Sequence, residues 1–115
     1  MLSVLRVAAL AHSQLEGALR PLDLTVDRWR VLMAIHAAPG ASMAEVIEAL
    51  VIPATSATRA VDALVDLGSV FRTSAPEDRR RVTLRLSSAG LRKLRQAQDV
   101  IHGIDLPQSQ PALGD

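Results

Sequence analysis

Three consecutive arginines at positions 79–81 form the most chemically distinctive group of residues in this sequence. They follow the turn-forming cluster Ala75-Pro76-Glu77-Asp78 and precede residues 82–86, where apolar and polar side chains alternate. That alternation predicts a half-buried strand, and Val70-Phe71-Arg72 before the turn predicts its partner. The pattern therefore indicates a β-hairpin that presents guanidinium groups to solvent. Such groups suit phosphate binding and insertion into a narrow DNA groove.

Positive charge is concentrated around this hairpin, although the formal net charge of the chain is only +1. From Arg72 to Arg95 the sequence contains eight basic residues and two acidic ones, Glu77 and Asp78. A basic segment in a nearly neutral protein is typical of a local surface that binds a polyanion.

The composition is that of one globular domain. Of its 115 residues, 49% are hydrophobic and only 2% are aromatic, which favours an aliphatic core of packed helices. The apolar runs are too short to span a membrane, and the N-terminus does not have the pattern of a signal peptide. The absence of cysteine excludes disulfides and thiolate metal sites. We expect a cytoplasmic protein that does not enter a membrane.

Residues for catalysis are not grouped along the chain. We find no Gly-rich phosphate loop, nucleophile–base pair or carboxylate cluster, so we expect no enzyme activity and no cofactor. His12, His36 and His102 fall on three different predicted helices. Isolated helical histidines are more often partly buried polar groups than metal ligands, so we expect no metal site.

Apolar periodicity, caps and breakers predict four helices before the hairpin and one after it. Thr25, Ser42 and Ser87 are the expected N-caps, and Glu45 completes a capping box with Ser42. The tight connection Val51-Ile52-Pro53 joins the third and fourth helices. The expected helices cover residues 2–19, 26–38, 43–50, 53–67 and 88–102.

Two short helices joined by a tight turn and followed by a hairpin define a winged helix-turn-helix, a mainly α fold with a small β-hairpin wing. We assign this domain to residues 1–103 and a C-terminal tail to residues 104–115. Trp29 is expected to anchor the core.

In a helix-turn-helix, the N-terminal end of the second helix enters the major groove. With Ala57, Val61 and Leu64 buried, Thr55, Ser56 and Arg59 are the best candidates to face outward. Within the wing, Asp78 is expected to orient Arg80 while the arginines contact phosphates. The alternative is a solvated helix end and a solvated charged turn. The candidate DNA-binding residues are Ala54, Thr55, Ser56, Thr58, Arg59, Arg72, Asp78, Arg79, Arg80 and Arg81.

Several segments of the chain together resemble the MarR family of winged-helix transcription regulators, over about residues 22 to 95. The paired signals are Thr-Arg-x-Val-Asp-x-Leu at residues 58–64 and Asp-x-Arg at 78–80 before Leu-Ser-x-x-Gly at 86–90. Leu24-Thr25 and Trp29-Arg30-Val31-Leu32 extend the resemblance toward the N-terminus.

The resemblance implies a homodimer on a pseudo-palindromic operator in double-stranded DNA. Recognition helices would occupy successive major grooves, and wing arginines would occupy the flanking minor grooves. It also implies dimerisation through terminal helices, here residues 1–20 and 88–103, with Leu2, Leu5, Ala9, Ile101 and Ile104 as contacts. In this family small anionic or phenolic effectors often release the DNA, and the weak candidates for such a ligand site are His12, Trp29 and His36.

We therefore expect a sequence-specific DNA-binding regulator that acts as a repressor. The alternative is a winged-helix protein-interaction module without independent DNA binding, which the near-neutral charge and short terminal helices favour.

Overall fold

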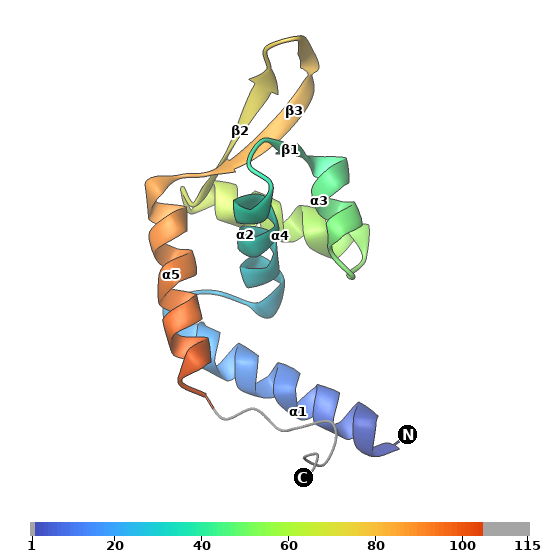
Figure 1. Cartoon of the computed structure of the whole chain (residues 1–115), viewed down its shortest axis with the longest axis vertical. Helices are drawn as coiled ribbons and strands as arrows, with labels where there is room; N and C mark the ends of the chain where they lie inside the picture. Colours follow the sequence, from blue (N-terminus) through green and yellow to red (C-terminus); the bar gives the residue numbers. More distant parts are fainter. Residues whose placement is uncertain (1, 105–115) are drawn as a thin grey trace.

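A computed structural model describes residues 2–104, with side chains from Val4 onward (Figure 1). It is a mainly α winged helix-turn-helix, which confirms the fold class predicted from the sequence. The predicted tail, apart from Ile104, and the side chain of Leu2 lie outside the described residues. In chain order the elements are α1 (Leu2–Leu19), the 3-10 helix η1 (Arg20–Leu22), α2 (Val26–Ala37), β1 (Ala41–Ser42), α3 (Met43–Ala49), α4 (Ala54–Asp66), β2 (Val70–Ala75), β3 (Asp78–Leu86) and α5 (Ser88–His102).

The helix boundaries follow from the caps identified in the sequence. The side chains of Thr25, Ser42 and Ser87 accept hydrogen bonds from backbone N–H groups in the first turns of α2, α3 and α5. At α3 the capping box is complete, because Glu45 Oε1 also accepts a hydrogen bond from Ser42 N at 2.8 Å. Gly68, with φ of 77°, provides the left-handed residue that follows α4.

The wing is a three-stranded antiparallel sheet in the order β1-β3-β2, although the sequence predicted only a two-stranded hairpin. The additional strand β1 pairs Ala41 with Leu84 and Ser42 with Thr83. A strand of two residues is too short to produce an alternating pattern, which is why the sequence did not reveal it. Because β1 leads directly into α3, the pairing joins the wing to the first helix of the helix-turn-helix.

The three arginines lie in an irregular part of the β2–β3 ladder. Ser74 pairs with Val82, but the next residue, Ala75, pairs with Asp78. One step along β2 thus corresponds to four steps along β3, and residues 79–81 have no partner in β2. Extra residues in a bulge redirect side chains away from the regular ladder. Residues 79–81 therefore lie outside the regular ladder, near the turn of the hairpin.

The core lies where α2, α4, α5 and the base of the wing meet. Its largest fully buried side chains include Leu32, Ile35, Leu64, Leu84 and Leu94. The alternation over residues 82–86 predicted Val82 on the buried face of the strand with Leu84 and Leu86, and for Val82 this was wrong, because its side chain is 41% exposed. The far part of the wing extends beyond the helices (Figure 1).

Trp29 packs against the core but is only half-buried. Its Nε1 atom is inaccessible and has no hydrogen-bond partner among the described residues.

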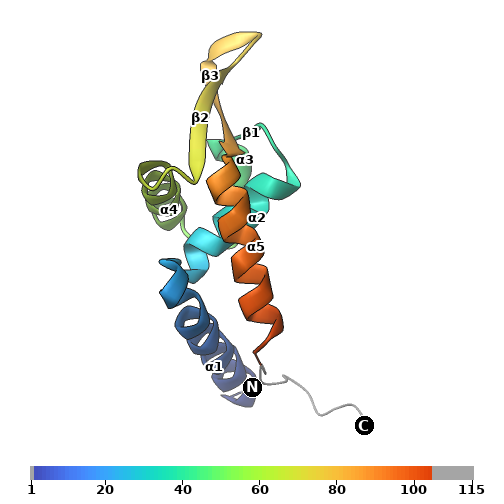
Figure 2. The same ribbon diagram turned by 90° about the vertical axis from the view of Figure 1, so that its left-hand side faces the viewer.

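Helix α1 leaves the body of the molecule and runs along the end opposite the wing (Figure 2). Leu19 is buried at its C-terminal end, whereas Val4, Leu5 and Leu10 are half or more exposed. No helix within residues 2–104 is both long enough and apolar enough to cross a membrane.

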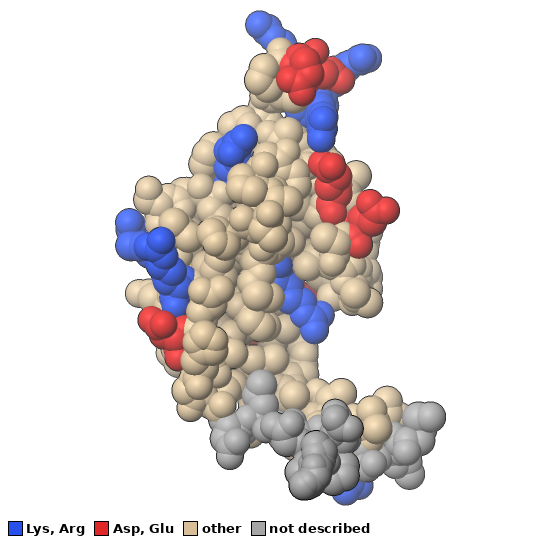
Figure 3. All heavy atoms as spheres, in the orientation of Figure 1, with Lys and Arg blue, Asp and Glu red and all other residues tan. Residues whose placement is uncertain are grey.

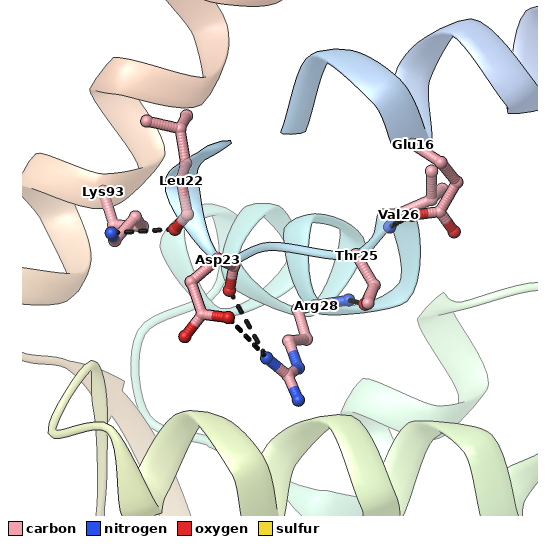
Figure 4. Close-up of polar contacts among 7 residues, drawn as sticks. All are labelled: Glu16, Leu22, Asp23, Thr25, Val26, Arg28 and Lys93. Carbon is pink, nitrogen blue, oxygen red and sulfur yellow. Dashed lines mark hydrogen bonds and ion pairs between the residues drawn. The ribbon is translucent and has the colours of Figure 1, made fainter. Parts of the chain in front are cut away.

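Polar contacts at the α1–α2 connection hold α1 against the body (Figure 4). Glu16 Oε1 accepts a hydrogen bond from Val26 N at 3.2 Å, and Lys93 Nζ of α5 donates to Leu22 O at 2.9 Å. Asp23 adopts a left-handed conformation with φ of 58°, and its carbonyl oxygen accepts a hydrogen bond from Arg28 Nη1 at 3.3 Å. Contacts from both α2 and α5 therefore position the C-terminal end of α1.

Candidate nucleic-acid interface

The outer face of α4 carries the small polar and basic residues predicted to read DNA. Four of the five candidates on this helix are exposed, and they line one shallow, open hollow together with Asp62: Ala54, Thr55, Thr58 and Arg59. Ser56, the fifth candidate, is half-buried and instead lines a cleft between α1, α2 and α4. Arg59 borders both the hollow and this cleft.

The opposite face of α4 fixes this orientation. Ala57, Ala60, Val61 and Leu64 are buried against the other helices.

The N-terminal end of α4 is also open to an anion. Pro53 occupies the N-cap and provides no side-chain hydrogen bond, and the first turn contains no acidic residue. The backbone N–H groups of that turn, with the positive end of the helix dipole, are therefore free to bind a phosphate oxygen.

At the wing, Asp78 contacts Arg80 twice. Asp78 Oδ1 accepts a hydrogen bond from Arg80 N at 3.0 Å and lies 3.5 Å from Arg80 Nε. The side chain of Arg80 is nevertheless 94% exposed. Asp78 thus restricts the backbone and the Nε atom of Arg80 and leaves the terminal guanidinium nitrogens exposed to solvent.

The other two arginine candidates with ion-pair partners are bound to helices of the helix-turn-helix. Arg72 of β2 forms an ion pair with Asp62 of α4. Arg81 Nη2 of β3 lies 3.1 Å from Glu45 Oε1 of α3, and its side chain is 47% exposed. Each long strand of the wing is therefore connected to a different helix below it.

Among the described residues, Glu45 is the only titratable group whose pKa clearly departs from its ordinary value. Hydrogen bonds with Ser42 lower the pKa of the Glu45 carboxyl below its ordinary value of 4.5. The largest contribution comes from the Ser42 backbone N–H, and the next from the Ser42 side chain. The hydrogen bond from Arg81 lowers this pKa further.

Glu45 and Asp62 were not predicted as functional residues from the sequence. Glu45 is separated from Arg81 by 36 positions, so no local spacing links them. Asp62 lies ten positions from Arg72, beyond the one or two helical turns over which side-chain pairs are predictable.

The charges are unevenly distributed on the face seen in Figure 3. Basic side chains project from the tip of the wing on either side of acidic side chains, and further acidic side chains lie over α3 below it. The basic side chains at the wing tip are thus the ones on this face that project furthest from the helices.

The three weak ligand candidates occupy different surroundings. His12 Nε2 lies 3.3 Å from Glu16 Oε2 on α1, and Trp29 packs against the core. His36 lines a cavity at the base of the wing with Arg85, Ser88 and Leu91. Within the part of the chain that the structure describes, no group of three or more metal-ligating side chains is assembled.

An exposed helix N-terminus beside an arginine-bearing wing defines a winged helix-turn-helix protein. The family model described as the MarR family matches residues 22–81. This chain belongs to the MarR family of winged-helix transcription regulators.

Two curated relatives illustrate the relationship. The chain is 33% identical over 90 residues to the multiple antibiotic resistance protein MarR of Escherichia coli strain K12, covering 78% of this chain and 62% of that protein. It is 28% identical over 95 residues to the HTH-type transcriptional repressor IacR of Pseudomonas putida, covering 83% of this chain and 57% of IacR. The chain therefore spans about three fifths of the length of these relatives.

Similar solved structures include regulators bound to DNA. A mutant MarR from E. coli complexed with operator DNA matches with a TM-score of 0.76 at 29% identity, covering 84% of this chain and 69% of the other. The transcriptional repressor CouR bound to a 23-mer DNA duplex matches with a TM-score of 0.79 at 28% identity, covering 85% and 69%.

Proposed function

We propose that this protein binds double-stranded DNA sequence-specifically and represses transcription as a homodimer on a pseudo-palindromic operator. The observation that carries this proposal is the joint exposure of the α4 N-terminal end and of Arg80 on the same domain. Thr55, Thr58 and Arg59 would face base edges in a major groove, with Arg59 able to bind guanine bidentately. The DNA-bound relatives of similar fold support this arrangement.

Under the same proposal the wing contacts the DNA backbone and an adjacent minor groove. Arg79 and Arg80 supply guanidinium groups, Asp78 limits the conformations of Arg80, and Arg72 and Arg81 belong to the same basic segment. Limiting an arginine before binding lowers the entropy that it loses in the complex.

The homodimer is supported by the exposed apolar side chains of α1. Val4, Leu5 and Leu10 are 50%, 61% and 51% exposed, and the described part of the chain does not cover them. Apolar side chains gathered on one projecting helix favour a protein–protein contact. Helix α5, which contacts α1, would contribute Ile101 to the same interface. A small anionic or phenolic effector that releases the DNA is part of the proposal, with His12, Trp29 and His36 as its first candidates.

Fluorescence anisotropy with a labelled duplex of mixed sequence tests the proposal. We expect binding at low salt that weakens steeply as salt increases, because phosphate contacts release counterions. Sedimentation of the same sample should give a dimer. A strict monomer that does not bind duplex DNA at low salt would instead favour the protein-interaction module.

A further inference from the structure

The exposed arginine at the wing tip and the arginine bound to α3 differ in their surroundings. The Arg80 side chain is 94% exposed, whereas Arg81 is 47% exposed and is bound to Glu45. Arg81 also lines a cavity between β1, α2 and α3, together with Gly40 and Ala41. Its guanidinium group is therefore directed back toward the helix-turn-helix and not away from it.

One carboxylate oxygen joins three elements at this point. Glu45 Oε1 accepts hydrogen bonds from Ser42 N at 2.8 Å and from Arg81 Nη2 at 3.1 Å. Ser42 is the last residue of β1 and the N-cap of α3, and it pairs with Thr83 of β3. Glu45 consequently contacts the start of α3 and the strand β3 on either side of the two-residue strand β1.

We propose that Glu45 is a positioning residue for DNA binding, which holds Arg81 and thereby fixes the angle of the wing relative to the helix-turn-helix. This inference rests on the proposed function. In this arrangement Arg79 and Arg80 contact phosphates, and Arg81 anchors the wing. The carboxylate is suited to this role because the hydrogen bond from Ser42 N keeps its oxygen in place even without Arg81.

The sign of the effect distinguishes positioning from simple electrostatics. A carboxylate near DNA repels phosphates, so its removal should strengthen binding if it acts only through its charge. If Glu45 positions the wing, Glu45→Ala should weaken DNA binding despite the removal of a negative charge. Glu48 is an exposed carboxylate on the same helix and provides the matched control.

The experiment compares DNA affinity at several salt concentrations for the full chain and its variants. We expect Glu45→Ala and Arg81→Ala each to weaken binding about 2- to 5-fold, the range of one exposed ion pair. The double variant should be no weaker than either single variant. The slope of affinity against salt should stay at the wild-type value, because the phosphates are still neutralised by Arg79 and Arg80. Glu45→Gln, which retains the acceptor oxygen, should recover most of the affinity, and Glu48→Ala should not weaken binding.

A separate control variant, Ser42→Ala, distinguishes loss of the helix cap from loss of the Glu45–Arg81 pair. Ser42→Ala removes the hydrogen bond from Glu45 N to Ser42 Oγ but leaves the Glu45–Arg81 pair. If Ser42→Ala weakens DNA binding as much as Glu45→Ala does, the effect comes from the helix cap and the inference is overturned. It is equally overturned if Arg81→Ala lowers the salt slope by about 0.9, the value for one neutralised phosphate, or if the two substitutions are additive.

A measurement without DNA separates this inference from the proposed function. The Gly40 N–H donates to Leu84 O at 3.0 Å, at the junction of β1 and β3. Its hydrogen exchange should become about 2- to 5-fold faster in Arg81→Ala. Unchanged exchange would contradict the anchoring role. Faster exchange in a protein that binds no DNA would overturn the proposed function and leave the anchor itself intact.

Discussion

Arginines of the wing differ in their partners, and the difference assigns them different tasks. Arg80 extends into solvent from a backbone that Asp78 holds, whereas Arg72 and Arg81 form ion pairs with Asp62 and Glu45. The sequence predicted the basic hairpin and the Asp78–Arg80 contact, because both are local. It did not predict the ion pairs to the helices, since they depend on how distant segments pack.

Replacing Arg80 tests the phosphate contact of the wing. We expect Arg80→Ala to weaken binding to all duplex sequences and to reduce the salt slope by about 0.9 for each phosphate that Arg80 neutralises. Arg92→Ala removes the same charge from an exposed position on α5 and should leave both quantities near the wild-type values. Equal effects of the two substitutions would show that only net charge matters.

Replacing Arg59 tests base recognition. Arg59→Ala should reduce discrimination between specific and mixed-sequence duplexes by about 1–3 kcal/mol, the range for one bidentate contact to guanine. Competition between the two duplexes in an anisotropy titration measures this difference. A uniform reduction of affinity for both duplexes would assign Arg59 to a phosphate instead.

The ends of the helices and the junctions between strands position the candidate DNA-binding residues. Most of these element boundaries could be predicted from the sequence. The caps at Thr25, Ser42 and Ser87 are visible as residue types at regular offsets from apolar runs. Strand β1 is not visible in the sequence. Its two residues form a strand only because they pair with β3, and they are too few to show an alternating pattern. The alternation over residues 82–86 likewise did not predict the exposure of Val82, because it gives no information on which strand residues other elements cover.

The junction between α5 and the end of α4 leaves no room for a side chain at Gly90. A Cβ atom there would lie 2.0 Å from the Ser69 carbonyl oxygen, which is backbone and unable to move away. We expect Gly90→Ala to lower the free energy of unfolding by about 1–3 kcal/mol or more. Thermal denaturation followed by circular dichroism measures it.

The matched control is Gly17→Ala in α1, where a Cβ would meet no atom within 4 Å. Alanine at that position should raise stability by up to about 1 kcal/mol. Equal destabilisation by both substitutions would contradict the steric explanation.

The start of α3 should depend on acid pH through Glu45. Because the pKa of its carboxyl lies below the ordinary value of 4.5 in the folded protein, the unfolded chain takes up the proton first as pH falls. The stabilisation by this carboxylate is therefore complete above pH 4.5 and disappears as pH falls through the pKa of the folded state. Unfolding measured between about pH 6 and about pH 3, the range that linkage defines, should show a shallower acid decline in Glu45→Gln than in the wild type. Glu48→Gln should decline like the wild type, and a wild-type slope in both variants would contradict the prediction.

At the scale of the whole molecule, the wing and α1 occupy opposite ends of the structure (Figure 1). DNA contacts and the proposed contact between two copies are thus separated in space. The sequence predicted an apolar stripe on α1 with a second apolar edge beside it, but only the C-terminal part of α1 packs against the body, near Leu15 and Leu19. How much of a stripe remains exposed depends on the crossing of α1 over α5, which no periodicity specifies.

A charge on the exposed part of α1 should weaken the dimer. We expect Leu5→Glu to shift the protein toward monomer in sedimentation velocity, because it places a carboxylate in an apolar contact. Leu67→Glu changes a leucine of similar exposure, 51% against 61%, at the end of α4 and should leave the dimer unaltered. Monomer formation by both variants, or by neither, would contradict dimerisation through α1.

Selection of bound duplexes from a random pool tests the proposed DNA recognition most directly. We expect an enriched pseudo-palindrome whose half-sites lie about one helical turn of DNA apart or a multiple of it, because two recognition helices then enter successive major grooves on one side of the duplex. Failure to enrich any sequence, with no retention of duplex at low salt, would contradict sequence-specific DNA binding by this protein.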